Sequence, residues 1–134
     1  MPDYLKVIVV DFDNTICVFR EDFACEELIA GAKEGLESLR EAGYRITISS
    51  ARNNVMYGGC GGEPHRLMYA FLKEHELAFD TIDTGGDGKP VGYRYIDDKG
   101  VGCPRTAQGA VDWPQVCRLI LGEEGGTAPL PQNS

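Results

Sequence analysis

The sequence lacks a surplus of positive charge and a long hydrophobic run. Its 13 Lys and Arg residues are outnumbered by 21 Asp and Glu residues, so the formal net charge is −8 at pH 7. Proteins that bind nucleic-acid phosphates or anionic lipid need the opposite balance. No apolar segment approaches the roughly 18–20 residues of a membrane span, which excludes a transmembrane protein. We therefore expect neither a membrane partner nor a nucleic-acid partner.

The cysteines show no paired pattern, and no targeting signal is expected. The five cysteines are an odd number and show no CxxC spacing, unlike the disulfide framework of a small secreted protein. Residues 1–4 contain no basic region or apolar stretch of signal-peptide length, which predicts a cytoplasmic location. The cysteines and His65 match no closed zinc pattern, so buried or idle thiols are favoured and zinc is the weaker alternative.

What is present is an alternation of strand and helix patterns. Residues 5–10 are apolar and mostly β-branched, which is typical of a parallel strand buried on both faces. From about Glu26, apolar residues recur every three or four positions, which predicts a helix that ends at Gly43. A second strand at 44–49 would complete a βαβ unit.

The second half continues the alternation. After an Asn- and Gly-rich loop we expect a helix, two strands and a last helix, at 64–77, 79–82, 91–96 and 114–122. The fold class is therefore α/β, with a Rossmann-like, open, mainly parallel sheet and flanking helices. Residues 1–122 are expected to form a single domain, and residues 123–134 a flexible tail.

Acidic residues follow two of the predicted strands. Asp11 and Asp13 come directly after the first strand, and Asp97 and Asp98 follow the fourth. An isolated D-x-D is more often a turn or a helix cap. However, the carboxyl ends of parallel strands meet at one edge of the sheet, and four gathered carboxylates need a compensating cation. Mg²⁺, which prefers carboxylate and phosphate oxygens, is the natural candidate.

Hydroxyl and cationic side chains are expected at the same edge. Ser50 ends the second strand, and Arg52 follows it, either as a contact to a substrate phosphate or as a surface ion pair. Lys89 precedes the fourth strand, and Ser49 and Lys99 are the alternatives to Ser50 and Lys89. A carboxylate nucleophile, a metal, a hydroxyl and an ammonium group together describe phosphoryl transfer.

These motifs resemble those of a known family. Residues 11–15, Asp-Phe-Asp-Asn-Thr, resemble the first motif, D-x-D-x-T/V, of the haloacid dehalogenase (HAD) superfamily. Ser50, Lys89 and the Asp97–Asp98 pair resemble its second, third and fourth motifs. The resemblance covers residues 5 to about 100 and implies a Mg²⁺-dependent phosphoric monoester hydrolase. Neither usual insertion point has room for a folded cap domain, so a small, capless member is expected.

The resemblance also implies a role for each residue. Asp11 would attack phosphorus and carry an aspartyl-phosphate intermediate. Asp13 would protonate the leaving oxygen and then activate water, while its backbone carbonyl binds the metal. Asp11, Asp97 and Asp98 would supply carboxylates to the metal, the last directly or through water. The transferring phosphoryl group would contact Thr15, Ser50, Arg52 and Lys89.

Two other function classes compete with this interpretation. A receiver domain that acts as a phosphorylation switch needs an acceptor Asp after a middle strand, and no Asp lies between Asp22 and Asp80. A catalytically idle HAD-like binding or scaffold protein is the alternative that is retained. The expected partner is a phosphorylated small molecule. The uncapped site also suits a larger substrate or closure by a second copy of the chain, and the sequence does not choose between these.

Overall fold

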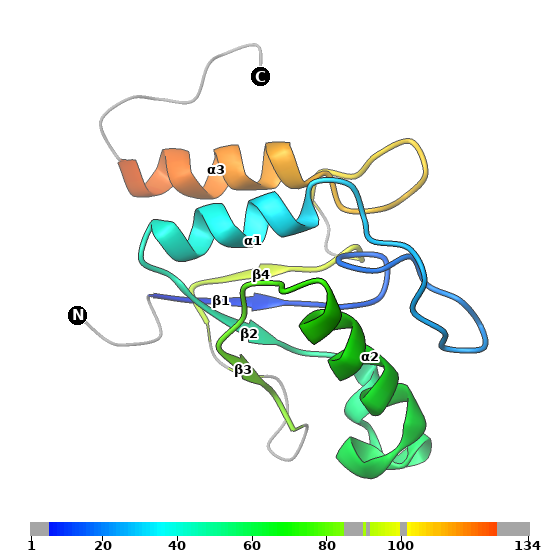
Figure 1. The fold of residues 1–134 in the computed structure, drawn as a ribbon. Helices are drawn as coiled ribbons and strands as arrows, with labels where there is room; N and C mark the ends of the chain where they lie inside the picture. The colour runs from blue at the N-terminus through cyan, green and yellow to red at the C-terminus, as the bar shows by residue number, and fades with distance from the viewer. Residues whose placement is uncertain (1–5, 85–89, 91, 100–101, 126–134) are drawn as a thin grey trace.

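The computed structural model describes residues 6–84, 90, 92–99 and 102–125. Four parallel strands form an open sheet in the order β3-β2-β1-β4 (Figure 1). Their bounds are Val7–Val10 for β1, Arg45–Ile48 for β2, Thr81–Ile82 for β3 and Arg94–Ile96 for β4. The predicted fold class, an open parallel α/β sheet with flanking helices, is confirmed.

The register brings three strand ends to the same level. Val10 of β1 is paired with Ile48 of β2 and with Ile96 of β4. The next residue of each strand therefore lies at one edge of the sheet. Backbone hydrogen bonds of 2.9 Å from Asp11 to Ile96 and from Ser49 to Val10 continue the ladders by one residue.

Helix α1 (Ala32–Glu41) begins later than the hydrophobic period predicts. The residues before it are held in other pairings: Leu28 bridges to Cys17, and the Ile29 N–H donates to the Ile16 carbonyl. The predicted end is confirmed, because Gly43 has a φ of 100° just after the last turn. Such a left-handed residue lets the following N–H groups bond back to the last helical carbonyls.

Helix α2 (Glu63–Glu74) starts one residue before Pro64, and the loop before it is a run of short 3₁₀ turns. Helix α3 (Trp113–Gly125) continues through Gly122, so the stop predicted there is wrong. A glycine inside a helix costs only about 1 kcal/mol, which the packing of α3 offsets. Most of the predicted tail, residues 126–134, lies outside the described residues. In the described part of the chain, no helix combines the length and hydrophobicity that a membrane crossing requires.

The three α-helices of the described residues pack on the same face of the sheet. The buried core joins every second strand residue, such as Ile8, Val10 and Ile48, to apolar residues of α1, α2 and α3. Alternate strand residues point to opposite faces. On the second face, Val9 is buried but Tyr95 is 43% exposed, and no described helix covers them. The predicted burial of the first strand on both faces is confirmed, because Ile8 and Val10 on one face and Val9 on the other are at most 2% exposed. Among the described residues, however, the helices cover only the first of these faces.

Trp113 joins α3 to the loop that follows β1. Its side chain is fully buried, and its indole N–H donates to the Thr15 carbonyl at 2.7 Å. Helix α1 passes close to it, because a Cβ atom on Gly35 would lie 2.5 Å from the Trp113 ring. Trp113 is therefore part of the hydrophobic core.

Candidate functional site

Three carboxylates converge at the ends of β1 and β4. Asp11, Asp97 and Asp98 each offer an oxygen atom, and these atoms all lie within 4.8 Å of one another. We call these three residues the acidic trio. The trio forms because β1 and β4 are paired in register, so that Asp11 and Asp97 follow matched residues. Asp13 is not a member of it.

The electrostatics of the trio favour a bound cation. Burial, followed by the neighbouring charge of Asp97, raises the pKa of Asp11 to about 8. Burial also raises the pKa of Asp98. In addition, Asp98 Oδ1 is buried and has no hydrogen-bond partner. Like charges held together with an unsatisfied oxygen fit Mg²⁺, which would remove the repulsion and take that oxygen as a ligand.

A small cavity lies beside the trio. It measures about 20 Å³ and is lined by Val9, Asp11, Ser49, Tyr95, Ile96 and Asp97. That volume holds about one water molecule or ion. Two lining residues bear hydroxyls, Ser49 and Tyr95. The Tyr95 hydroxyl already donates to the Pro90 carbonyl at 2.7 Å, which leaves Ser49 as the candidate donor. The Ser50 hydroxyl instead accepts the Arg52 N–H at 3.1 Å and caps the 3₁₀ turn η2 (Ala51–Asn53).

The Thr15 hydroxyl contacts two members of the trio, Asp11 and Asp98. It is 3.4 Å from Asp11 Oδ2, a long contact, and it accepts the Asp98 N–H at 3.2 Å. The residue is fully buried. A hydroxyl without solvent exposure has no free side for a substrate, so Thr15 does not make the predicted phosphate contact in this arrangement. It links the loop after β1 to the loop after β4.

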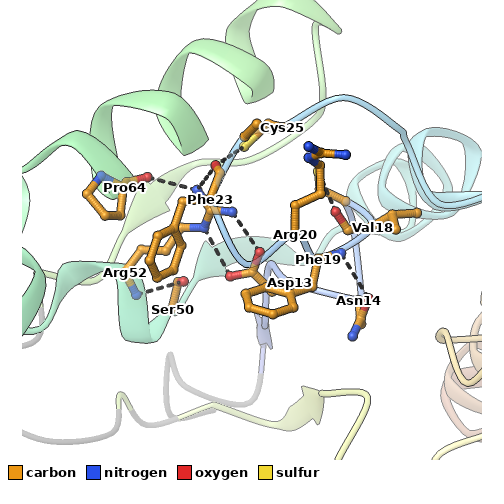
Figure 2. Close-up of polar contacts among 12 residues, drawn as sticks. Asp13, Asn14, Val18, Phe19, Arg20, Phe23, Cys25, Ser50, Arg52 and Pro64 are labelled. Atoms are coloured by element: carbon orange, nitrogen blue, oxygen red, sulfur yellow. Dashed lines mark hydrogen bonds and ion pairs between the residues drawn. The ribbon is translucent and has the colours of Figure 1, made fainter.

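The Asp13 carboxylate is paired with Arg52 (Figure 2). Arg52 Nη2 donates to Asp13 Oδ1 at 2.8 Å, and Arg52 Nε donates to Asp13 Oδ2 at 3.0 Å. The Arg52 side chain is 1% exposed, so the predicted surface ion pair is in fact a buried one. Burial alone would lower the pKa of Arg52, but its bonds to Asp13 raise it above the ordinary value.

Further contacts occupy the rest of the Arg52 guanidinium. Nη1 donates to the Phe23 carbonyl at 2.9 Å and to the Pro64 carbonyl at 3.0 Å. The guanidinium carbon lies 5.0 Å from the ring centre of Phe12 and 5.2 Å from that of Phe23. Each guanidinium nitrogen of Arg52 therefore donates to a protein group, and its contact to a substrate phosphate stays a prediction.

The two candidate lysines are placed differently. Lys89 lies outside the described residues. Lys99 has an exposed side chain, and its backbone N–H donates to Asp97 Oδ1 at 2.9 Å. Sequence reasoning missed Arg105, whose Nη1 donates to the Asp98 carbonyl at 2.7 Å. It follows Asp98 by only seven residues, but no motif pointed to it, because the strand-end motifs stop at the acidic pair after β4.

The cysteines do not gather into a metal site. All five are free, and the acidic trio is the only group of three or more His, Cys, Asp or Glu residues in the described part that could hold a metal ion. Two of the thiols interact: a hydrogen bond with Cys25 raises the pKa of Cys17, and the same bond lowers the pKa of Cys25.

Cavity size alone does not identify this site. One larger cavity, about 450 Å³, lies between the ends of α1 and α2 and is lined by Glu37, Arg40, Glu41, Glu76, Leu77 and Ala78. Another, about 530 Å³, is lined mainly by residues 27–30 and 106–110. Neither contains a member of the trio. We place the candidate site at the trio because the titratable groups there are perturbed by one another.

Comparisons with known proteins support the fold. No protein-family description matches the chain, and no curated protein matches it. A conserved protein from Bacteroides thetaiotaomicron has a similar structure, with a TM-score of 0.65 and 25% identity over 89% of this chain and 92% of that one. A structural-genomics target from Vibrio cholerae has a TM-score of 0.54 and 24% identity over 90% of this chain and 99% of that one. The described fold is therefore one that other proteins share across nearly their whole length.

Proposed function

We propose that this protein is a Mg²⁺-dependent phosphomonoesterase that forms an aspartyl-phosphate on Asp11. The observation that carries the proposal is the convergence of Asp11, Asp97 and Asp98, with one buried oxygen unsatisfied. The resemblance of the strand-end motifs to the HAD superfamily supports the same chemistry. A bound Mg²⁺ would neutralise the trio and the charge of the transferring phosphoryl group.

In the first step, an Asp11 oxygen attacks phosphorus and the bond from phosphorus to the ester oxygen breaks. The leaving oxygen takes a proton from Asp13. In the second step, water attacks the phosphorus of the aspartyl-phosphate and gives a proton back to Asp13. Inorganic phosphate leaves and the Asp11 carboxylate is restored, so the cycle balances in atoms and charge.

Other residues would bind the phosphoryl oxygens. Ser49 lines the small cavity with Asp11 and Asp97, so its hydroxyl is the donor that the geometry favours. Lys89 is retained from the motif resemblance as the cationic partner. The substrate is expected to be a phosphorylated small molecule.

The test is hydrolysis of p-nitrophenyl phosphate with Mg²⁺ and with a chelator. We expect turnover that needs Mg²⁺, a phosphorylated Asp11 that mass spectrometry detects after acid quench, and loss of both in Asp11→Asn. Cys60→Ala is the matched control, because Cys60 is exposed and outside the site. Binding of Mg²⁺ without turnover of any phosphate ester would favour the idle binding protein instead.

A further inference from the structure

We propose that Arg52 is a positioning residue that holds the Asp13 carboxylate apart from the acidic trio and reserves it for proton transfer. This inference rests on the proposed function, because it concerns the same reaction. It goes further by giving Arg52 a role that neither the motif resemblance nor a phosphate contact would give it.

The geometry of the pair fixes both the place and the orientation of the carboxylate. Two hydrogen bonds of 2.8 and 3.0 Å join the planar guanidinium of Arg52 to both oxygens of Asp13. Such a fork-to-fork pair is stronger and more directional than a single ion contact. Asp13 retains 23% side-chain exposure while Arg52 has 1%. One edge of the carboxylate is therefore still accessible to a substrate.

Arg52 is itself anchored from three segments of the chain. Its side chain donates to carbonyls of Phe23, in the loop before α1, and of Pro64, in α2 (Figure 2). Its backbone N–H donates to Ser50 after β2. Moving the guanidinium would break its bonds to the two partly buried carbonyls of Phe23 and Pro64, which costs free energy for each. The arginine is thus a fixed support for Asp13.

A fixed support is needed because Asp13 is only two residues from Asp11. A divalent cation at the trio would attract any free carboxylate nearby as a further oxygen ligand. A carboxylate bound to the cation would be a poor carrier for the proton of the leaving group. With Arg52 in place, the trio with its cation and Asp13 with its arginine form two separate sets. The carboxylate paired with Arg52 is the base form that takes a proton from water in the second step, and the protonated Asp13 so formed is the acid of the next cycle.

The experiment compares two esters in the Arg52→Met variant. Nitrophenolate leaves without a proton, so a rapid burst of it should persist, followed by slow turnover and accumulation of phosphorylated Asp11. Glycerol phosphate needs a proton for its leaving oxygen, and its hydrolysis should fall by about 10²–10⁴-fold, the typical size of general acid–base catalysis. In an Asp13→Asn background, Arg52→Met should cause no further loss of activity.

Two further variants serve as controls. Arg40→Met removes another arginine–aspartate pair, Arg40 with Asp80 at 2.9 Å, which lies at an exposed site away from the trio. It should leave both esters unaffected. Arg52→Lys keeps the charge but loses the fork, and should lose glycerol phosphate activity in the same selective way but less severely. If Arg52→Met proves unfolded by circular dichroism, the lysine variant carries the test.

Several outcomes would overturn the inference. If Arg52→Met lost the burst and lost activity on both esters to the same degree, Arg52 would only support the fold. An additive loss in the Asp13→Asn background would mean that Arg52 does not act through Asp13. If the wild-type protein hydrolysed neither ester, both the proposed function and the inference about Arg52 would be overturned. In the first two outcomes the wild type is active, so only the inference about Arg52 fails.

Discussion

At the scale of single residues, the trio shows how position changes the chemistry of an ordinary side chain. Asp11 follows a central strand, where burial and the charge of Asp97 make its ionised form costly. Asp13, two residues along, is paired with Arg52. Two carboxyl groups of one short motif therefore occupy different environments, which is a common basis for a division of labour in an active site.

The raised pKa of Asp11 predicts that the stability of the metal-free protein depends on pH. The pKa of Asp11 in the folded state is about 8, well above that of an unfolded chain, so the folded state binds the proton more tightly. The free energy of unfolding should therefore fall as pH rises from about 4 to about 8. The Asp11→Asn variant has no carboxylate at this position and so avoids the cost of ionising it in the folded state. In chelator at pH 8 it should be more stable than the wild type by roughly 1–3 kcal/mol, because one pKa unit amounts to about 1.4 kcal/mol and solvent screens part of the repulsion.

Urea unfolding at pH 4, 6 and 8 in chelator would measure this difference. The matched control is Glu37→Gln, an exposed carboxyl group on α1, which should leave the pH dependence unchanged. If Asp11→Asn were as stable as the wild type or less stable at pH 8, repulsion within the trio would not destabilise the metal-free protein.

Residue roles were only partly predictable from the sequence. The convergence of Asp11, Asp97 and Asp98 was predictable because parallel strands end at one edge. The choice between Ser49 and Ser50 was not, because it depends on which hydroxyl caps the 3₁₀ turn. The pairing of Arg52 with Asp13 joins residues 39 positions apart. No spacing rule in the sequence indicates such a contact, since it depends on how the loop before α1 folds.

At the scale of elements, the contact between α1 and α3 limits what α1 can accommodate. Gly35 faces the Trp113 ring, and a Cβ there would also lie 3.2 Å from Cys117 Sγ. The hydrophobic period predicted α1 well at its end but not at its start. The start depends on backbone pairings of Leu28 and Ile29 with the loop after β1, and such tertiary pairings override local propensity.

Gly35→Ala should therefore destabilise the protein although alanine is the better helix former. In an exposed helix position the exchange would gain up to about 1 kcal/mol. Here overpacking against a fully buried tryptophan should cost about 1–3 kcal/mol net, measured by urea unfolding. Ser38→Ala, on the exposed side of α1, is the control and should be slightly stabilising. A Gly35→Ala protein as stable as the control would mean that α1 and α3 can separate without cost.

At the scale of the whole molecule, charge and fold act together. The net charge of −8 disfavours compaction by self-repulsion, and the trio concentrates part of that charge at one edge of the sheet. The α/β class, the parallel sheet and the strand-end site were predictable from periodicity. The placement of all helices on one face of the described sheet was not, because an apolar strand looks the same whether helices or loops bury its second face.

Mg²⁺ should therefore raise the melting temperature of the wild-type protein through binding at the trio. A ligand at 100 times its dissociation constant stabilises the folded state by about 2.7 kcal/mol. Differential scanning fluorimetry with MgCl₂, compared with NaCl at matched ionic strength, separates binding from screening. Asp97→Asn should lose most of the Mg²⁺-specific shift and Glu37→Gln should keep it. An equal shift in all three proteins would show that Mg²⁺ acts only as a screening salt.

Strand β1 lies between β2 and β4, while β4 is paired on one side only among the described strands. Local opening begins where backbone hydrogen bonds are fewest. Amide hydrogens of residues 8–10 should then exchange with deuterium more slowly than those of residues 94–96. When the sheet opens locally, β4 should separate first and move Asp97 and Asp98 away from the site, while Asp11, the proposed nucleophile, stays in place at the end of β1.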